Sequence, residues 1–170
     1  RLMANENISE VTAWLDQEQV ANPRGPQFED KGGHVFARTS SGKTMHLALP
    51  TLAGHGILIH YVCRSGQLTV DSVSGNIYKT SRLPEHRFKP TTQYACPSEI
   101  NFDTVSSTDA VKSTEQLLTA LIEGQEFPTA ENALQALMCV VASHVSHEKN
   151  HVAVSINPSH LPIDRVFSWA

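Results

Sequence analysis

Apolar and polar residues alternate along several short stretches in the first half of the chain. In one of them, Met45, Leu47 and Leu49 alternate with His46 and Ala48. A period of two residues is typical of a β-strand with one buried face. This stretch and others rich in β-forming residues predict strands over residues 8–16, 34–40, 44–50, 57–63, 67–73 and 77–82.

Short turns separate these predicted strands. The segments "SGK", "RSG" and "SGN" each combine a glycine with a serine. Turns of this kind between β-rich runs predict hairpins, and therefore antiparallel pairing. Residues 17–33 contain two prolines and three glycines, and this composition predicts a long flexible loop.

The hydrophobic period changes after residue 105. Residues 107–124 and 128–150 carry apolar residues every three or four positions, which predicts two helices. Gly124 is placed to end the first helix, and Thr129 is placed to cap the start of the second. Residues 151–156 predict a last strand, and residues 157–170 form a Pro-containing tail.

Strands followed by helices predict a single α+β domain over residues 1–170. We expect a mostly antiparallel, open-faced sheet of about six strands with two helices packed on one face. The length of 170 residues and the 40% apolar content suit one domain with a real core. Two helices cannot cover both faces of such a sheet, so the other face should meet water, a ligand or another protein.

Charge and cysteine content exclude several classes of protein. The net charge is −4 and the charges are mixed along the chain, which argues against a nucleic-acid partner. No apolar run approaches the roughly 20 residues that span a bilayer, so we expect no membrane partner. Cys63, Cys96 and Cys139 are odd in number and far apart, which favours a reducing, cytoplasmic location over a disulfide framework.

Two glycine-containing motifs resemble nucleotide-binding sequences without meeting their requirements. "SSGKT", at residues 40–44, lacks the glycine of a phosphate loop because Ala37 stands in its place, and we interpret it as a hairpin turn. "GHG", at residues 54–56, lacks the third glycine of a dinucleotide fingerprint because Ile59 stands there. The sequence therefore predicts no cofactor-binding residues.

The nine histidines do not form a recognised catalytic or metal motif. His144, His147 and His151 are close in sequence, but no HExxH motif is present, and we interpret them as a polar helix end with cationic imidazoles. His46 and His60 fall on predicted strands. No GxSxG motif or useful pair of carboxylates is present, so we predict no catalytic residue and no metal ligand. A metal-dependent enzyme that uses the histidine cluster is a third hypothesis.

Two segments resemble the second domain of the glucose–fructose oxidoreductase, inositol dehydrogenase and rhizopine-catabolism family (Gfo/Idh/MocA). The first, residues 35–71, has the family's series of strands and ends in "CRSGQLTVD". Gly66 and Leu68 match the family's turn there, whereas Arg64 stands where many members have glycine.

The second segment, residues 117–154, resembles the family's closing helix and strand. Asn132 and Ala133 replace the usual charged residue and glycine, and the resemblance covers roughly residues 8–156. The matching residues are Gly124, Pro128, Leu134, Ala136, Leu137 and Ser143.

The resemblance implies a further, N-terminal domain that lies outside this sequence. Family members begin with a Rossmann domain that binds NAD or NADP, followed by a helix with a catalytic His/Asp pair. Arg1 and Leu2 would be the last residues of that helix, so no residue of this chain matches the catalytic or cofactor-binding groups. The implied protein is an NAD(P)-dependent oxidoreductase acting on a sugar, polyol or related hydroxy compound, and the fragment alone is expected to be inactive.

In family members this domain forms one wall of the substrate cleft, and its exposed sheet face pairs with another subunit. By loop position, the residues expected to face the substrate are His55, Arg82, Glu85 and His86. We expect a homo-oligomer formed through the exposed sheet face. The alternative hypothesis is a stand-alone binding or assembly module with no catalytic activity.

Overall fold

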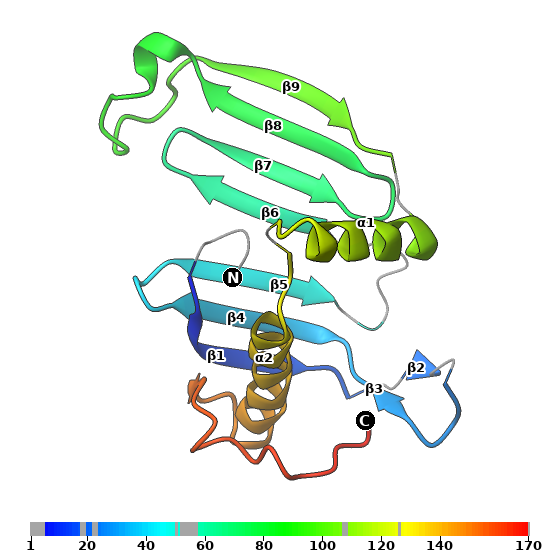
Figure 1. Ribbon diagram of the computed structural model, residues 1–170. Coiled ribbons are helices and arrows are strands. Elements are labelled where there is room, and N and C mark those ends of the chain that lie inside the picture. The colour runs from blue at the N-terminus through cyan, green and yellow to red at the C-terminus, as the bar shows by residue number, and fades with distance from the viewer. Residues whose placement is uncertain are drawn as a thin grey trace. The chain divides into compact units, whose positions relative to one another are not determined.

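The computed structural model describes residues 6–17, 20–21, 24–49, 51, 58–106, 109–125 and 127–169. The chain divides into two compact units, of which the first contains residues 1–53 and 117–170 and the second contains residues 54–116. Each unit is built on an antiparallel four-stranded sheet (Figure 1).

The sheet of the first unit joins strands from opposite ends of the chain. The strand order is β10-β1-β4-β5, and all neighbours are antiparallel. The strands are β1 (Ile8–Leu15), β4 (Gly33–Thr39), β5 (Thr44–Leu49) and β10 (Val154–Ser155). Because β10 pairs with β1, with Val154 opposite Val11, the last strand is tied directly to the first.

The turn between β4 and β5 contains the "SSGKT" segment. The Thr39 N–H donates to the Lys43 carbonyl at 2.8 Å, and Gly42 adopts a φ of +87°, which glycine reaches without strain. The hairpin interpretation of this segment is confirmed. No helix begins at this turn, so it is not built as a phosphate loop.

Part of the predicted flexible loop over residues 17–33 forms a short ladder. β2 (Val20–Ala21) pairs with β3 (Glu29–Asp30), and the Arg24 guanidinium lies over the Phe28 ring at 4.4 Å. This ladder was not predicted, because two-residue strands are too short to show a hydrophobic period.

Helix α2 (Ala130–Glu148) covers one face of the first sheet. The Thr129 side chain accepts a hydrogen bond from the Asn132 N–H, which satisfies one of the free donors at the helix start and confirms the predicted cap. Four buried residues recur at helical spacing and pack on Val11 of β1. These four residues are Met138, Val141, Ala142 and Val145.

The segment after β10, labelled a tail in the sequence analysis, packs on the same core. Leu161 and Phe167 are only 5% and 6% exposed and belong to the cluster around α2. The Arg165 guanidinium makes two hydrogen bonds with the Glu148 carboxylate, at 2.6 and 2.7 Å. The C-terminal segment therefore completes the hydrophobic core of the first unit.

The sheet of the second unit has the strand order β6-β7-β8-β9, again antiparallel throughout. Its strands are β6 (Leu58–Cys63), β7 (Gly66–Asp71), β8 (Asn76–Arg82) and β9 (Ser98–Thr104). Strand β9 was not predicted from the sequence, although Ile100 and Phe102 alternate with polar residues along it. A three-residue 3₁₀ turn, Pro84–His86, lies in the loop that connects β8 to β9.

Helix α1 (Ala110–Ile122) contains residues of both units. At its start, the Asp109 carboxylate accepts a hydrogen bond from the Lys112 N–H at 2.7 Å. At its end, Gly124 has a φ of +67°, and the Gln125 N–H donates to the Ala120 carbonyl at 2.8 Å. The predicted left-handed glycine cap is confirmed.

These elements confirm an α+β fold with antiparallel sheets. The grouping of strands differs from the expected sheet of about six, because the main described strands form two separate four-stranded sheets. Hydrophobic period identifies a strand but does not identify its hydrogen-bonding neighbour. Of the two helices expected on one sheet face, packing against a sheet is described for α2.

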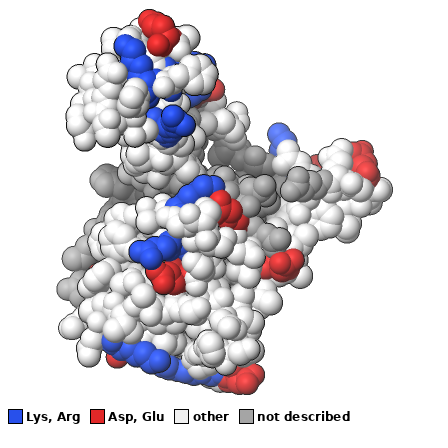
Figure 2. Space-filling model, turned by 90° about the vertical axis from the view of Figure 1, so that its left-hand side faces the viewer, with Lys and Arg blue, Asp and Glu red and all other residues white. Residues whose placement is uncertain are grey.

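Charge is mixed on the surface of the first unit. On the face shown in Figure 2, its Lys and Arg side chains lie next to Asp and Glu. Ion pairs within the first unit include Arg38 with Glu10 at 3.1 Å and Arg165 with Glu148. Within the described part of the chain, no helix has the length and apolar character needed to cross a membrane.

Candidate functional site

Arg82, one of the predicted substrate-facing residues, is the last residue of β8. Its guanidinium donates hydrogen bonds to three backbone carbonyls of the following loop, those of Lys89, Pro90 and Gln93, at 3.1 to 3.3 Å. Its own N–H donates to the Ser65 carbonyl at 2.7 Å. Arg82 therefore orders the loop of residues 83–97, and its contact with a substrate stays a prediction.

Glu85 and His86 lie together in that loop. Their carboxylate and imidazole are 3.9 Å apart, and the His86 side chain is 18% exposed whereas that of Glu85 is 64% exposed. The His86 Nδ1 atom is buried without a hydrogen-bond partner among the described residues. The structure thus brings Arg82, Glu85 and His86 into one segment, while His55 lies outside the described residues.

The same loop presents two aromatic side chains that the sequence analysis did not single out. Phe88 and Tyr94 are 92% and 86% exposed. An apolar ring in a Pro-containing loop between strands is the sequence signal that could have identified them. Since Arg82 fixes the backbone of this loop, both rings are displayed from an ordered segment.

A pocket of about 300 Å³ lies in the first unit, between α2, β3 and the C-terminal segment. Helix α2 contributes Val140 and His144, which are four residues apart and share one face of the helix. The remaining lining residues are Arg24, Asp30, Lys31 and Trp169. The volume is at the lower end of the range for ligand pockets, about 300–1,000 Å³.

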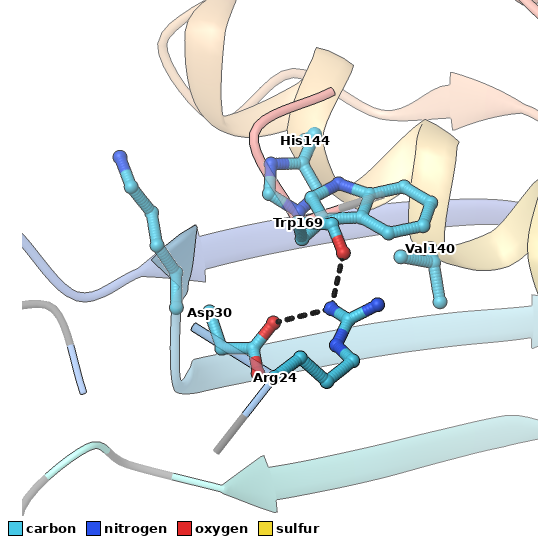
Figure 3. Close-up of a pocket in the computed structure, with 6 residues that line it drawn as sticks. Arg24, Asp30, Val140, His144 and Trp169 are labelled. Carbon is cyan, nitrogen blue, oxygen red and sulfur yellow. Dashed lines mark hydrogen bonds and ion pairs between the residues drawn. The ribbon is translucent and has the colours of Figure 1, made fainter. Parts of the chain in front are cut away.

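One side of this pocket is ordered by Arg24 (Figure 3). Its guanidinium donates to the Trp169 carbonyl and lies 3.7 Å from the Asp30 carboxylate. A further hydrogen bond, from the Glu29 N–H to the Ser168 carbonyl at 2.9 Å, joins the same two segments. These contacts hold the end of the chain beside β3.

Part of the pocket lining is aromatic. The Trp169 indole packs against the Phe167 ring at 5.3 Å and lies 5.8 Å from the His144 imidazole. Burial lowers the pKa of His144 below its ordinary value of 6.5, and the positive charge of Lys31 acts in the same direction. His144 is therefore neutral near pH 7.

His147 and His151, the other members of the predicted histidine cluster, bind the backbone of β1. The Leu15 N–H donates to the His147 Nδ1 atom at 3.2 Å, and the His151 Nδ1 atom lies 2.8 Å from the Ala13 carbonyl oxygen. Within the described ranges, no three His, Cys, Asp or Glu residues are grouped to hold a metal ion.

The predicted cationic helix end is wrong for His144 and His147. Burial is the largest cause that lowers the pKa of His147, followed by the neighbouring His151. His147 must also stay unprotonated at Nδ1 to accept the hydrogen bond from Leu15. Both imidazoles are partly buried, and this cost outweighs the favourable field of the helix C-terminus.

Acid should destabilise the first unit through His144 and His147. Their neutral forms are favoured in the folded state, whereas the unfolded chain takes up protons near its ordinary pKa of 6.5. Their contribution to stability is therefore complete above pH 6.5. It is lost as the pH falls from 6.5 to the lowered pKa values that the two histidines have in the folded state. Urea unfolding followed by tryptophan fluorescence should give a lower free energy of unfolding at about pH 5.5 than at about pH 8.

The variant His147→Gln is the control for this pH dependence. Glutamine keeps a side-chain acceptor but does not titrate, so the variant should lose part of the change in stability between these pH values. The lowered pKa values of Asp16 and Glu148 act in a more acidic range, below about pH 4.5. A free energy of unfolding that stays constant or rises on acidification to about pH 5.5 would contradict the assignment.

The sheet face of the first unit that faces away from α2 carries a row of rings. The Trp14 and Phe36 rings meet edge to face at 5.6 Å, and the Phe36 ring stacks on the His46 imidazole at 4.3 Å. His46 in turn lies within hydrogen-bond distance of His34, at 3.2 Å between ring nitrogens. Cross-strand ring pairs of this kind stabilise the pairing of β1, β4 and β5.

The second unit has an exposed apolar sheet face. The register of its strands places His60, Thr69, Tyr78 and Phe102 in one row across β6 to β9. The apolar side chains on this face are more than half exposed. They are Leu58, Val62, Tyr78, Ile100 and Phe102.

Comparison with known proteins shows similarity in fold. No protein-family model matches the sequence, and no curated protein matches it. Two solved structures share the fold at low sequence identity. One is a protein from Desulfitobacterium hafniense assigned as an NADPH-dependent oxidoreductase, with a TM-score of 0.61 and 14% identity.

The other is a super-repressor mutant of Gal80p from Saccharomyces cerevisiae, with a TM-score of 0.56 and 9% identity. The matches cover 88% and 91% of this chain, but only 42% and 45% of the two structures. The chain thus spans less than half the length of the proteins it resembles. At these identities the comparison shows a fold found in an oxidoreductase-type protein.

Proposed function

We propose that this chain is the C-terminal domain of an NAD(P)-dependent oxidoreductase acting on a sugar, polyol or related hydroxy compound. In this role it supplies a wall of the substrate cleft and an oligomer interface, and the nicotinamide is bound by a Rossmann domain outside this sequence. The observation that carries the proposal is the fold match over 88% of the chain to part of an oxidoreductase-type structure. The motifs in residues 35–71 and 117–154 support it independently.

The described residues do not fit a dinucleotide site. Such a site needs a glycine-rich turn between a strand and the start of a helix, where backbone N–H groups bind the pyrophosphate. Helix α1 begins after Asp109 and helix α2 begins after Thr129, and neither start follows a glycine-rich turn. The cofactor therefore belongs to the implied domain, and this chain contributes to binding and orienting the substrate.

The loop of residues 83–97 is the described segment most suited to that contribution. Arg82 orders it, and Glu85 with His86 provides groups that can form hydrogen bonds with a hydroxyl-rich substrate. His55 belongs to the same proposal by its position in the sequence. All four residues are proposed to face the substrate, and none is proposed to transfer the hydride.

Titration of the isolated chain with NADH tests the proposal that the cofactor is bound outside this chain. We expect no saturable change in NADH fluorescence, because the groups that bind a dinucleotide are absent from the described residues. A longer protein that includes the coding region before Arg1 should bind NADH. Tight NADH binding by the 170-residue chain itself would contradict the proposal.

A stand-alone binding or assembly module is the second candidate. It is favoured by the fold similarity to Gal80p, whose matching structure is that of a super-repressor mutant. The two candidates make different predictions about the gene. A start codon immediately before the codon for Arg1 supports the stand-alone module, and an open frame encoding a Rossmann domain supports the oxidoreductase.

The oligomer interface is proposed to be the exposed apolar face of the second unit, with a second copy of this chain as the partner. Leu58, Val62, Ile100 and Phe102 are all more than half exposed on that face. A contiguous apolar surface of this kind on a folded protein usually marks an interaction site. Pairing of the same face on two copies gives a closed two-fold dimer.

The variant Phe102→Asp should shift the protein from dimer to monomer, since it places a charge at the centre of the proposed interface. Analytical ultracentrifugation measures the dissociation constant of the dimer. We expect it to rise at least about tenfold, roughly the effect of burying one unpaired charge. Asn101→Asp is the matched control, because Asn101 lies next in β9 and points to the opposite face. Equal dimerisation of both variants would exclude this face.

A further inference from the structure

We propose that the pocket between α2, β3 and the C-terminal segment binds a small organic carboxylate with a single aromatic ring. The lining combines two cations, Arg24 and Lys31, with one carboxylate, Asp30, and with the apolar surfaces of Val140 and Trp169. This site lies within the first unit and is independent of the oxidoreductase assignment.

The charges in the pocket favour an anion. The Arg24 guanidinium is 3.7 Å from the Asp30 carboxylate, so these two charges offset each other. Lys31 then leaves the lining with one net positive charge. The next carboxylate along α2, that of Glu148, is bound by Arg165, and His144 is neutral near pH 7.

The size and the apolar walls of the pocket suit a ligand with a small apolar ring. The volume of about 300 Å³ leaves room for a one-ring carboxylate. Val140 and the Trp169 indole both line the pocket and can pack against an apolar ring. Lys31 also lines the pocket and is the proposed partner of a carboxylate on that ring, since charge-assisted hydrogen bonds are the stronger ones.

Benzoate is a suitable probe, and the full chain reports its binding through one indole N–H signal in a nitrogen-15 spectrum. The chain has two tryptophans, and the variant Trp14→Phe identifies the signal of Trp169. We expect benzoate to shift the Trp169 signal saturably. Benzyl alcohol, which has the same ring without the charge, and acetate, which has the charge without the ring, should each bind at least about tenfold more weakly.

Lys31→Gln removes the proposed carboxylate partner and should weaken benzoate binding about tenfold. Lys149→Gln is the matched control, because Lys149 is an exposed lysine of the same unit that does not line the pocket. Val140→Phe should fill the pocket and abolish the shift. Thermal unfolding of each variant confirms that it is folded before binding is measured.

Three results would overturn the proposal. The first is the absence of a saturable shift with benzoate in the folded wild-type chain. The second is equal benzoate binding by Lys31→Gln and Lys149→Gln, which would separate binding from the charge in the pocket. The third is binding of benzyl alcohol or acetate as tight as that of benzoate, which would exclude an aromatic carboxylate as the ligand class.

Discussion

Phe167→Ala is expected to lower the free energy of unfolding by about 3–5 kcal/mol, the usual cost of removing a buried aromatic ring. Phe167 is 6% exposed and belongs to the core cluster that joins β1, α2 and the C-terminal segment. Its ring also contacts the Trp169 ring at 5.3 Å and lies under the Arg165 guanidinium at 4.6 Å. The substitution leaves a cavity at the point where the C-terminal segment is attached to α2.

Urea unfolding followed by tryptophan fluorescence measures this loss, because Trp14 and Trp169 both belong to the first unit. A total stability of only about 5–15 kcal/mol is usual for a domain, so the variant could unfold at room temperature. Phe167→Leu keeps most of the volume and should stay folded with a smaller loss. Phe88→Ala removes a ring that is 92% exposed and should change stability by less than about 0.5 kcal/mol. Equal stability of Phe167→Ala and Phe88→Ala would show that the C-terminal segment does not belong to the core.

Local periodicity was sufficient to predict both helices and most of the strands. The predicted strand over residues 8–16 corresponds to β1, and the helix over residues 128–150 corresponds to α2. In both elements, the spacing of the apolar residues follows directly from the geometry of a strand or helix that buries one of its faces. Strand β9 was not predicted, although Ile100 and Phe102 alternate with polar residues in the same way. The pattern was present in the sequence and was not interpreted as a strand.

The packing of the C-terminal segment and the pocket could not be predicted in this way. The hydrogen bond from Arg24 to the Trp169 carbonyl joins residues 145 positions apart. A backbone carbonyl has the same chemistry at every position, so no sequence pattern marks it as a partner. The pocket depends on that contact and on α2, and it exists only after distant segments have met.

The same reasoning applies to the predicted substrate-facing residues. Arg82 ends a strand, Glu85 and His86 lie in the loop that follows it, and their contact with a substrate stays a prediction. Loop position could not show that the Arg82 guanidinium binds three backbone carbonyls of its own loop. An arginine in such a position can orient a loop, bind a ligand or do both, and the side-chain geometry shows the first of these roles for Arg82.

Ser146→Ala is expected to lower the free energy of unfolding by about 1–3 kcal/mol, since it leaves the buried Ala13 N–H without a partner and removes the hydrogen bond to the carbonyl of the half-exposed Val152. Ser146 is completely buried in α2. Its Oγ atom accepts a hydrogen bond from the Ala13 N–H at 3.0 Å and donates one to the Val152 carbonyl at 2.7 Å. One hydroxyl thus connects the helix to β1 and to the segment that leads into β10.

Ser143→Ala is the matched control, because Ser143 is also buried and lies one turn earlier in the same helix. Its hydroxyl donates only to the Cys139 carbonyl, at 2.8 Å, a bond within the helix that contributes little to stability. Alanine at this position should therefore change the free energy of unfolding by less than about 1 kcal/mol. Measured by the same urea titration, losses of similar size for the two variants would mean that the contact of Ser146 with β1 is not what holds the helix to the sheet. A much larger loss for Ser146→Ala would instead show that a polar contact, in addition to apolar packing, fixes the position of α2 on the sheet.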